Sequence, residues 1–255
     1  MSNLYVNDRL ILEDVELVIF DKDGTLVDIH HYWGGMIKVR AKRIVQKYTH
    51  RVQGCISEIE IAELMGLDVQ TNRLKPDGPV GVKPRKYIVD LVKKYVCQHG
   101  CTTTHYDVEL LFKAVDQETQ NHLLPLIKSL SGVERLLKRL ELLNIKAAIA
   151  STDITNRVLK TVKALNFESY FFKIAGGDLV ECAKPCPDLA RLLLSESGCR
   201  PSRSVVIGDH PVDMLMGKSA GIETNIGVLN GISNREDFLK CECILVDSLG
   251  NVNVK

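Results

Sequence analysis

The second half of the sequence alternates between helical patterns of apolar residues and short apolar runs. From about residue 131 onward, leucines and valines recur at helical spacing between these runs. Such alternation is typical of a parallel sheet with helices on both faces. The runs predict strands at 145–150, 171–175, 204–207, 224–229 and 243–246, and the spacing predicts helices through 133–143, 158–165, 187–194 and 211–220. Ser131 and Glu134 have the spacing of a capping box at the start of the first of these helices.

An earlier apolar run, Glu16–Phe20, ends in four consecutive apolar residues, as expected for a strand that is covered on both faces. It breaks into Asp-Lys-Asp-Gly-Thr, where Gly24 permits a sharp turn. Ligands of open α/β sheets bind where the strands end. A carboxylate at Asp21 can attack as a nucleophile or hold a metal, and one at Asp23 can transfer a proton. An ordinary acidic turn is the alternative.

The segment between this strand and residue 126 has helical periods and no convincing strand. Apolar residues repeat on one face after Pro84 and again from Val108 to Val115. We therefore predict an α/β core formed by residues 1–29 and 130–255, with a helical cap domain, residues 30–129, inserted after the first strand. A domain inserted beside a catalytic strand end is a natural lid.

Charge and hydropathy remove several classes of protein from consideration. The 255 residues include 33 basic and 32 acidic side chains, so there is no basic excess of the kind that nucleic-acid binding requires. The longest apolar runs are too short to span a membrane, and the first residues lack a signal-peptide pattern. We expect a cytoplasmic protein.

The eight cysteines lack the Cys-x-x-Cys spacing of zinc ribbons and redox motifs. We therefore expect reduced thiols, several of them buried as small apolar groups. They include three loose pairs, Cys97 with Cys101, Cys182 with Cys186, and Cys241 with Cys243. His99 and His105 lie close to the first pair in the sequence, which leaves a metal clip as an alternative there.

Polar motifs follow four of the predicted strands in turn. They are Asp21 with Asp23, Ser151 with Thr152, Lys184 followed by Pro185, and Asp209 with Asp213 in Gly-Asp-x-x-x-Asp. In this order they resemble the four motifs of the haloacid dehalogenase superfamily. The resemblance covers the whole chain, including a helical cap between the first and second motifs as in phosphoglycolate phosphatase and β-phosphoglucomutase relatives. It implies a doubly wound, Rossmann-like α/β core with an inserted α-helical cap.

The resemblance also implies the catalytic roles. Asp21 is the expected nucleophile, which forms an aspartyl-phosphate. Asp23 is expected to protonate the leaving oxygen and then to activate water. Lys184 is expected to offset negative charge on the nucleophile and on the transferring phosphoryl group. Such a cation is needed because a phosphate monoester dianion repels nucleophiles and hydrolyses very slowly by itself.

Mg²⁺ is the implied cofactor, since it accepts few carboxylates and keeps phosphate and water oxygens as ligands. The implied metal ligands are Asp21, the main-chain carbonyl of Asp23, Asp209, and Asp213 either directly or through another ligand. Asp213 has the alternative role of stabilising a helix N-terminus, and Lys184 alone resembles a surface lysine.

The substrate phosphate is expected to meet the end of the second core strand. By the same resemblance, Ser151 would donate to a phosphoryl oxygen beside the main-chain N–H of Thr152, while the alternative is that the Ser-Thr-Asp segment only caps the next helix. In the cap, Arg40, Arg43 and Arg85 are candidates for a substrate anion, although solvated helix charges are the more ordinary interpretation.

The expected function is a magnesium-dependent phosphatase for a small phosphate monoester such as phosphoglycolate or a sugar phosphate, without a nucleic-acid or membrane partner; the oligomeric state is left open. A phosphomutase shares all four motifs and is the main alternative. A dehalogenase would not need Asp23, and a phosphonate hydrolase would need a reactive cap lysine, for which nothing distinguishes Lys38, Lys42 or Lys47. A non-catalytic phosphometabolite-binding protein would be expected to lack Asp21 or Lys184.

Overall fold

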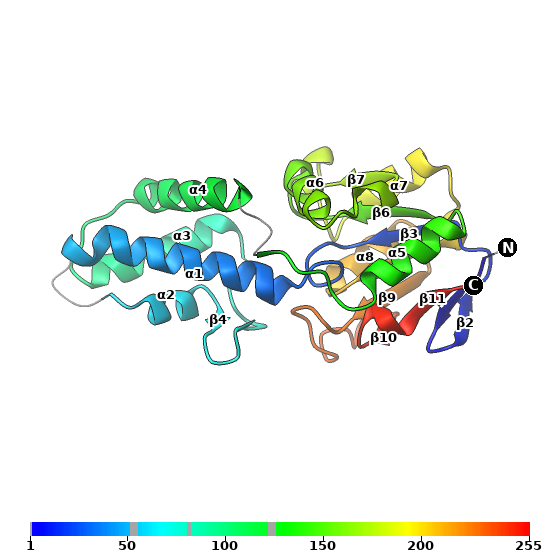
Figure 1. Ribbon diagram of the computed structural model, residues 1–255, viewed down its shortest axis with the longest axis horizontal. Coiled ribbons are helices and arrows are strands. Elements are labelled where there is room, and N and C mark those ends of the chain that lie inside the picture. The colour runs from blue at the N-terminus through cyan, green and yellow to red at the C-terminus, as the bar shows by residue number, and fades with distance from the viewer. Residues whose placement is uncertain (1, 52–55, 81–82, 122–125) are drawn as a thin grey trace. The chain divides into compact units, whose positions relative to one another are not determined.

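The structure is a computed structural model that describes residues 2–51, 56–80, 83–121 and 126–255. Contacts divide the chain into two compact units, which Figure 1 traces by colour along the sequence. One unit combines Met1–Asp28 with Ile127–Lys255, and the other is Ile29–Leu126.

The first unit contains a six-stranded parallel sheet with the strand order β10-β9-β8-β3-β6-β7. Every strand predicted for the α/β core is present, with ends within two residues of those expected. The strands are β3 (Leu17–Phe20), β6 (Lys146–Ala150), β7 (Lys173–Ala175), β8 (Ser204–Gly208), β9 (Thr224–Val228) and β10 (Ile244–Val246). The predicted parallel sheet is confirmed.

Four helices flank the sheet: α5 (Val133–Leu142), α6 (Thr155–Ala164), α7 (Asp188–Ser197) and α8 (Pro211–Ser219). The chain proceeds outward from β3 to β6 and β7, and then returns to β8 on the other side of β3. Because crossovers between parallel strands are right-handed, this reversal places α5 and α6 on one face, and α7 and α8 share a core cluster on the other. The reversal point between β3 and β8 is where doubly wound sheets bind ligands.

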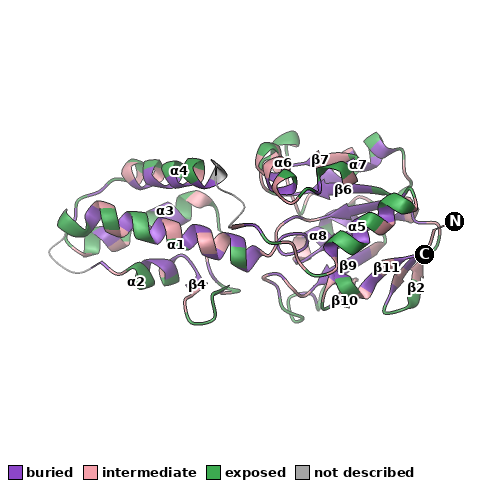
Figure 2. Ribbon diagram, in the orientation of Figure 1, coloured by how far each residue is buried: buried purple, intermediate pink, exposed green. Residues whose placement is uncertain are grey.

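The continuous apolar pattern of β3 follows from burial on both faces. Leu17 and Ile19 belong to a core cluster with Leu189 and Leu193 of α7. Val18 and Phe20 point to the opposite face of the sheet. All four residues of the strand are at most 1% exposed. Figure 2 shows the sheet as a buried layer beneath more exposed helices. Full burial of an aliphatic side chain contributes about 1.5–3 kcal/mol, so β3 is firmly anchored.

Two features of this unit differ from the sequence prediction. A small antiparallel sheet, ordered β11-β1-β2, joins both ends of the chain through β1 (Leu4–Val6), β2 (Arg9–Leu12) and β11 (Val252–Val254). The predicted capping box is wrong, because Gly132 is the N-cap of α5 and no side chain caps it. Gly132 has a φ of 86°, and a Cβ there would lie 2.3 Å from the main-chain nitrogen of Gly250.

The second unit is mainly helical, as its periodicity predicts. Its helices are α1 (Ile29–Tyr48), α2 (Glu58–Leu64), α3 (Arg85–Gln98) and α4 (His105–Asn121). The expectation of no strand is wrong in detail, since β4 (Leu67–Asp68) pairs with β5 (Arg73–Leu74) in a two-residue antiparallel ladder. Strands this short leave no periodic signal in a sequence.

Short 3₁₀ turns complete the described elements of the chain. They are Thr49–Arg51 (η1), Glu168–Tyr170 (η3), Gly177–Leu179 (η4), Pro201–Arg203 (η5) and Leu249–Asn251 (η6). Among the residues that the structure describes, no helix has the length and apolar character needed to cross a membrane.

Candidate active site

Three carboxylates converge at the reversal point of the parallel sheet. Asp21 follows β3 and Asp209 follows β8, and these two strands are hydrogen-bonded neighbours. Asp213 lies in the first turn of α8, directly after β8. One oxygen from each carboxylate lies within 4.8 Å of the other two. The structure thus brings together residues that are up to 192 positions apart in the sequence (21 to 213).

Lys184 lies between two of these carboxylates. Its Nζ donates to Asp21 Oδ1 and to Asp213 Oδ1, both at 2.6 Å. Its side chain is only 1% exposed, so the surface-lysine interpretation is wrong. Burial opposes its charge, but Asp21 and Asp213 outweigh that effect and raise the pKa of Lys184. Asp213 also serves the helix, since its Oδ2 accepts from the main-chain nitrogen of His210 at 3.1 Å.

The carboxylate cluster carries more negative charge than Lys184 can balance. Three carboxylates and one ammonium group give a formal charge of −2. Burial raises the pKa of Asp21 despite Lys184, and burial together with the neighbouring carboxylates raises that of Asp209 well above its usual range. A divalent cation would relieve this repulsion, and an all-oxygen donor set suits Mg²⁺.

Two glycines allow the backbone to approach the side chain of Asp209 closely. A Cβ at Gly24 would lie 2.2 Å from Asp209 Oδ2, and one at Gly231 would lie 1.8 Å from the same atom. Gly24 also has a φ of +83°, which favours glycine by itself. The turn that follows Asp21 therefore depends on glycine both for its backbone conformation and for space beside a candidate metal ligand.

Asp23 lies apart from the three clustered carboxylates. Its Oδ2 is 3.0 Å from Nζ of Lys22, while its Oδ1 is shielded from solvent and has no hydrogen-bond partner among the described residues. Burial raises the pKa of Asp23, and the charge of Lys22 only partly offsets that effect. A carboxyl group with a raised pKa can be protonated when a substrate arrives, which a proton donor requires.

Ser151 and Thr152 follow β6, the strand beside β3. Ser151 is buried, and its Oγ accepts from the main-chain nitrogen of Asp153 at 3.1 Å, while Thr152 is exposed. The helix-capping alternative is wrong, because α6 has Ile154 as its N-cap without any side-chain cap. The hydroxyl of Ser151 keeps its proton available for another acceptor.

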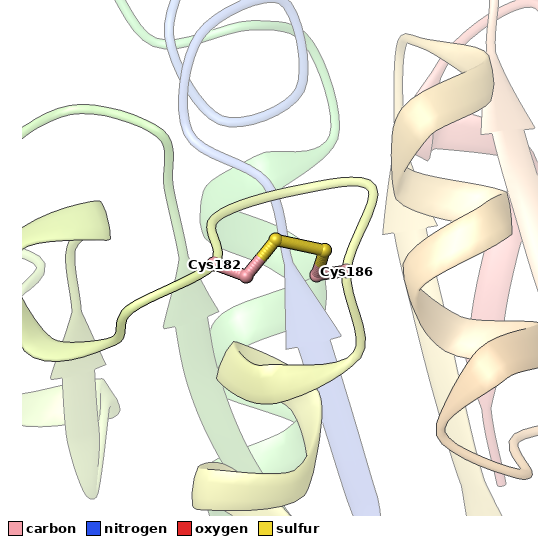
Figure 3. Close-up of a disulfide and its surroundings, with 2 residues drawn as sticks. All are labelled: Cys182 and Cys186. Atoms are coloured by element: carbon pink, nitrogen blue, oxygen red, sulfur yellow. A yellow bond between two sulfur atoms is a disulfide. The ribbon is translucent and has the colours of Figure 1, made fainter.

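A disulfide brackets Lys184. Cys182 and Cys186 are joined, with their Cα atoms 5.7 Å apart, and Figure 3 shows the bond closing the loop between them. The prediction of reduced thiols is wrong for this pair. The two cysteines can pair because the chain turns between them. The main-chain nitrogen of Cys186 donates to the carbonyl of Ala183 at 3.0 Å, and this turn brings the side chains of Cys182 and Cys186 together. The other cysteines within the described residues are free thiols.

The arginines predicted as candidates in the helical unit are held by acidic partners of the same unit. Arg40 is buried and lies 2.8 Å from Asp116, to which Arg85 is also paired. Arg43 forms an exposed pair with Glu118 at 2.6 Å. The interpretation of Arg40 as a solvated helix charge is therefore wrong.

The Nδ1 atoms of the two histidines near Cys97 and Cys101, where a metal clip was the alternative, are taken by other partners. The Nδ1 atom of His99 pairs with the carbonyl of Tyr95 at 2.9 Å, and that of His105 pairs with Asp90 at 2.6 Å. Among the residues that the structure describes, the acidic cluster at the sheet edge is the group suited to hold a metal ion.

Two charged residues beside Asp23 escaped the sequence analysis. Lys22 is fully buried, and its Nζ contacts both Asp23 and Asp153. The sequence offered one indication of the role of Lys22, since it lies between two aspartates at the end of a buried strand, where a charged side chain needs a partner. Asp153 carried no such signal, because its partner is 131 positions away in the sequence.

Comparison with known proteins places this chain in a family. The family model described as haloacid dehalogenase-like hydrolase matches residues 18–226. A phosphorylated carbohydrates phosphatase from Thermotoga maritima is 25% identical over 230 residues, which are 90% of this chain and 93% of that protein. A pyrophosphatase from Bacillus pumilus is 36% identical over 104 residues, 41% of this chain and 48% of that protein.

Solved structures agree on the fold. The crystal structure of a putative β-phosphoglucomutase from Thermotoga maritima has a TM-score of 0.70 at 22% identity, and the match covers 92% of this chain and 95% of that one. A structure of CbbY from Rhodobacter sphaeroides in complex with phosphate has a TM-score of 0.60 at 20% identity, with 92% and 95% of the two chains covered.

Proposed function

Because this chain belongs to the haloacid dehalogenase-like hydrolases, we propose that it is a magnesium-dependent phosphatase that cleaves small phosphate monoesters through an aspartyl-phosphate on Asp21. The observation that carries the proposal is Lys184, which is buried and in contact with both Asp21 and Asp213 beside a third carboxylate. A sensor of phosphorylated ligands would not need a buried ammonium group held between a potential nucleophile and a second carboxylate.

In the proposed reaction, Asp21 attacks phosphorus and the bond from phosphorus to the ester oxygen breaks. Asp23 gives its proton to that leaving oxygen, and the alcohol departs. Asp23 then takes a proton from water as the water oxygen attacks phosphorus, which releases phosphate and restores the Asp21 carboxylate. Lys184 stabilises the nucleophile and the transferring phosphoryl group throughout.

We propose that Asp21, Asp209 and Asp213 would hold the metal ion, with the main-chain carbonyl of Asp23. The close approach of the three carboxylates fits this assignment, as does the uncompensated charge of the cluster. When bound, Mg²⁺ supplies positive charge that offsets the repulsion between the carboxylate and the phosphate. Ser151 would hydrogen-bond a phosphoryl oxygen, beside the main-chain N–H of Thr152.

We propose residues 1–29 and 130–255 as the catalytic core and residues 30–129 as the cap that selects the substrate. Sugar phosphates are the first substrate class to test, because a relative matched over most of both chains is named a phosphorylated carbohydrates phosphatase. Phosphoglycolate follows, since another relative from Aquifex aeolicus, 30% identical over 92 residues, is named for it.

The test is phosphate release from a panel of sugar phosphates, phosphoglycolate and p-nitrophenyl phosphate, with Mg²⁺ and with EDTA. We expect release that requires the metal and is lost in Asp21→Asn. Isomerised sugar phosphate without net phosphate release would instead identify a phosphomutase. A folded Asp21→Asn protein with wild-type turnover would refute the proposed chemistry.

A further inference from the structure

Lys22 is a long cationic side chain with no exposed surface, located between the two aspartates of the Asp-x-Asp motif. Burial of an ammonium group is costly unless charged partners compensate for the lost hydration. It lies two residues after β3, which pairs with β6 and β8 on both sides, and its main-chain carbonyl accepts from the nitrogens of Leu26 and Val27.

The partners of Lys22 connect two strand ends. Its Nζ lies 3.0 Å from Asp23 Oδ2 and 3.1 Å from Asp153 Oδ2. Asp153 is held in turn, because its Oδ1 accepts from Arg157 Nη1 and from the main-chain nitrogen of Ile154, both at 2.8 Å. Lys22 is therefore braced against the first turn of α6 as well as against its neighbour Asp23.

The two oxygens of Asp23 are treated differently by this arrangement. Oδ2 is paired with Lys22, whereas Oδ1 is shielded from solvent and has no hydrogen-bond partner within the described part of the chain. Because a carboxylate is planar, fixing one oxygen restricts where the other can lie. Lys22 therefore fixes the orientation of the whole Asp23 carboxyl group, whose side chain is 18% exposed.

The charges around the Asp-x-Asp motif form two separate sets. Lys184 compensates Asp21 and Asp213, while Lys22 and Arg157 compensate Asp23 and Asp153. The second set is electrically neutral and contains no member of the acidic metal-holding cluster. Lys22 thus contacts the carboxylates of Asp23 and Asp153, whereas Lys184 contacts those of Asp21 and Asp213.

We propose that Lys22, braced by Asp153, is a positioning residue that anchors Oδ2 of Asp23 and thereby aligns its carboxyl group for proton transfer. This inference rests on the proposed phosphatase function. During cleavage of the ester, the proton moves from the carboxyl group of Asp23 to the leaving oxygen as its bond to phosphorus breaks. A misaligned Asp23 would transfer that proton less effectively, while attack by Asp21 would still have Lys184.

The experiment compares substrates that differ in their need for that proton. In Lys22→Met, kcat/KM is measured for p-nitrophenyl phosphate, whose leaving group departs readily as an anion, and for the best sugar phosphate of the panel. This constant reports the steps through transfer to Asp21. We expect about a 100-fold loss for the sugar phosphate, within the usual range for general acid catalysis, and only a several-fold loss for p-nitrophenyl phosphate.

Three further variants make the test specific. Asp23→Asn should show the same substrate selectivity with a larger loss. Asp153→Asn removes the brace at nearly constant volume, keeps the Lys22–Asp23 pair, and should give a smaller loss in the same direction. Lys173→Met, which removes the same type of side chain from a partly exposed pair with Glu196, should affect neither substrate.

The outcomes distinguish this inference from the proposed function. Equal losses on both substrates in Lys22→Met, or no loss, would overturn the positioning role while the wild-type protein remains a phosphatase. If Lys22→Met does not fold, Asp153→Asn decides, and an absence of substrate selectivity there overturns the role. A wild-type protein that releases no phosphate from any substrate would instead refute the proposed function.

Discussion

Replacement of Lys184 by methionine tests how the acidic cluster is held together. The change removes a cation that is 2.6 Å from both Asp21 Oδ1 and Asp213 Oδ1 and keeps a side chain of similar length. The side chains of Lys184 and Asp213 are 1% and 2% exposed, so water cannot take the place of the lost ammonium group. The variant leaves three neighbouring carboxylates with no cation between them.

The expected magnitude follows from that burial. Removing one partner of a buried ion pair costs about 3–5 kcal/mol. At about 2–4 °C per kcal/mol for a chain of this size, the unfolding midpoint at neutral pH should fall by roughly 10 °C. The loss should shrink as the pH falls, because carboxyl groups with a raised pKa become neutral and their repulsion disappears. Turnover should fall by at least about 100-fold, as for loss of other electrostatic stabilisers.

The assay is thermal unfolding in EDTA at neutral and acidic pH, followed by phosphate release in Mg²⁺. Lys218→Met is the matched control, because Lys218 pairs with Glu242 on the surface with 61% and 84% of the side chains exposed. Exposed pairs contribute at most about 1 kcal/mol. An unfolding midpoint for Lys184→Met that equals the control, with turnover retained, would refute the electrostatic account of the cluster.

Two other predictions concern stability. Asp209→Asn should raise the unfolding midpoint of metal-free protein at neutral pH, since an acid whose pKa is raised on folding destabilises the native state above its unfolded pKa. The rise in the unfolding midpoint should vanish at acidic pH. A midpoint for Asp209→Asn below that of the wild type at neutral pH would contradict the prediction. Reducing the Cys182–Cys186 disulfide with dithiothreitol should lower the unfolding free energy by about 2 kcal/mol, the loop-closure value for so short a loop. Chemical denaturation with and without dithiothreitol measures this change in the unfolding free energy. The reductant should not change the unfolding free energy of Cys182→Ser. If it lowers that of the variant as much as that of the wild type, the disulfide is not the cause.

The sequence predicted the sheet because its strands are buried on both faces and therefore leave continuous apolar runs. Glu16–Phe20 and 204–207 are examples, and both end in aspartates that the structure brings together. The two-residue ladder of β4 and β5 left no such pattern, nor did the sheet that joins the chain termini. The spacing of apolar residues predicts a helix or strand only where that element buries a whole face.

The candidate site was predictable to the extent that each residue follows a strand end. The contacts of Lys22 and Asp153 were not, because they depend on how two adjacent strand ends are spaced in three dimensions. The disulfide was also missed, since a four-residue spacing gives no reason to expect pairing until the turn around Lys184 is known. Such side-chain pairings are set by tertiary structure and leave little trace in a single sequence.

The central claim is that Asp21 accepts the phosphoryl group. The most direct measurement is mass spectrometry of protein quenched with acid within milliseconds of mixing with p-nitrophenyl phosphate and Mg²⁺. The account predicts a phosphoryl group on the peptide that contains Asp21, its accumulation in Asp23→Asn, where water is poorly activated, and its absence in Asp21→Asn. Turnover with the phosphoryl group on another residue, or with Asp21 unmodified in both the wild type and Asp23→Asn, would contradict the account.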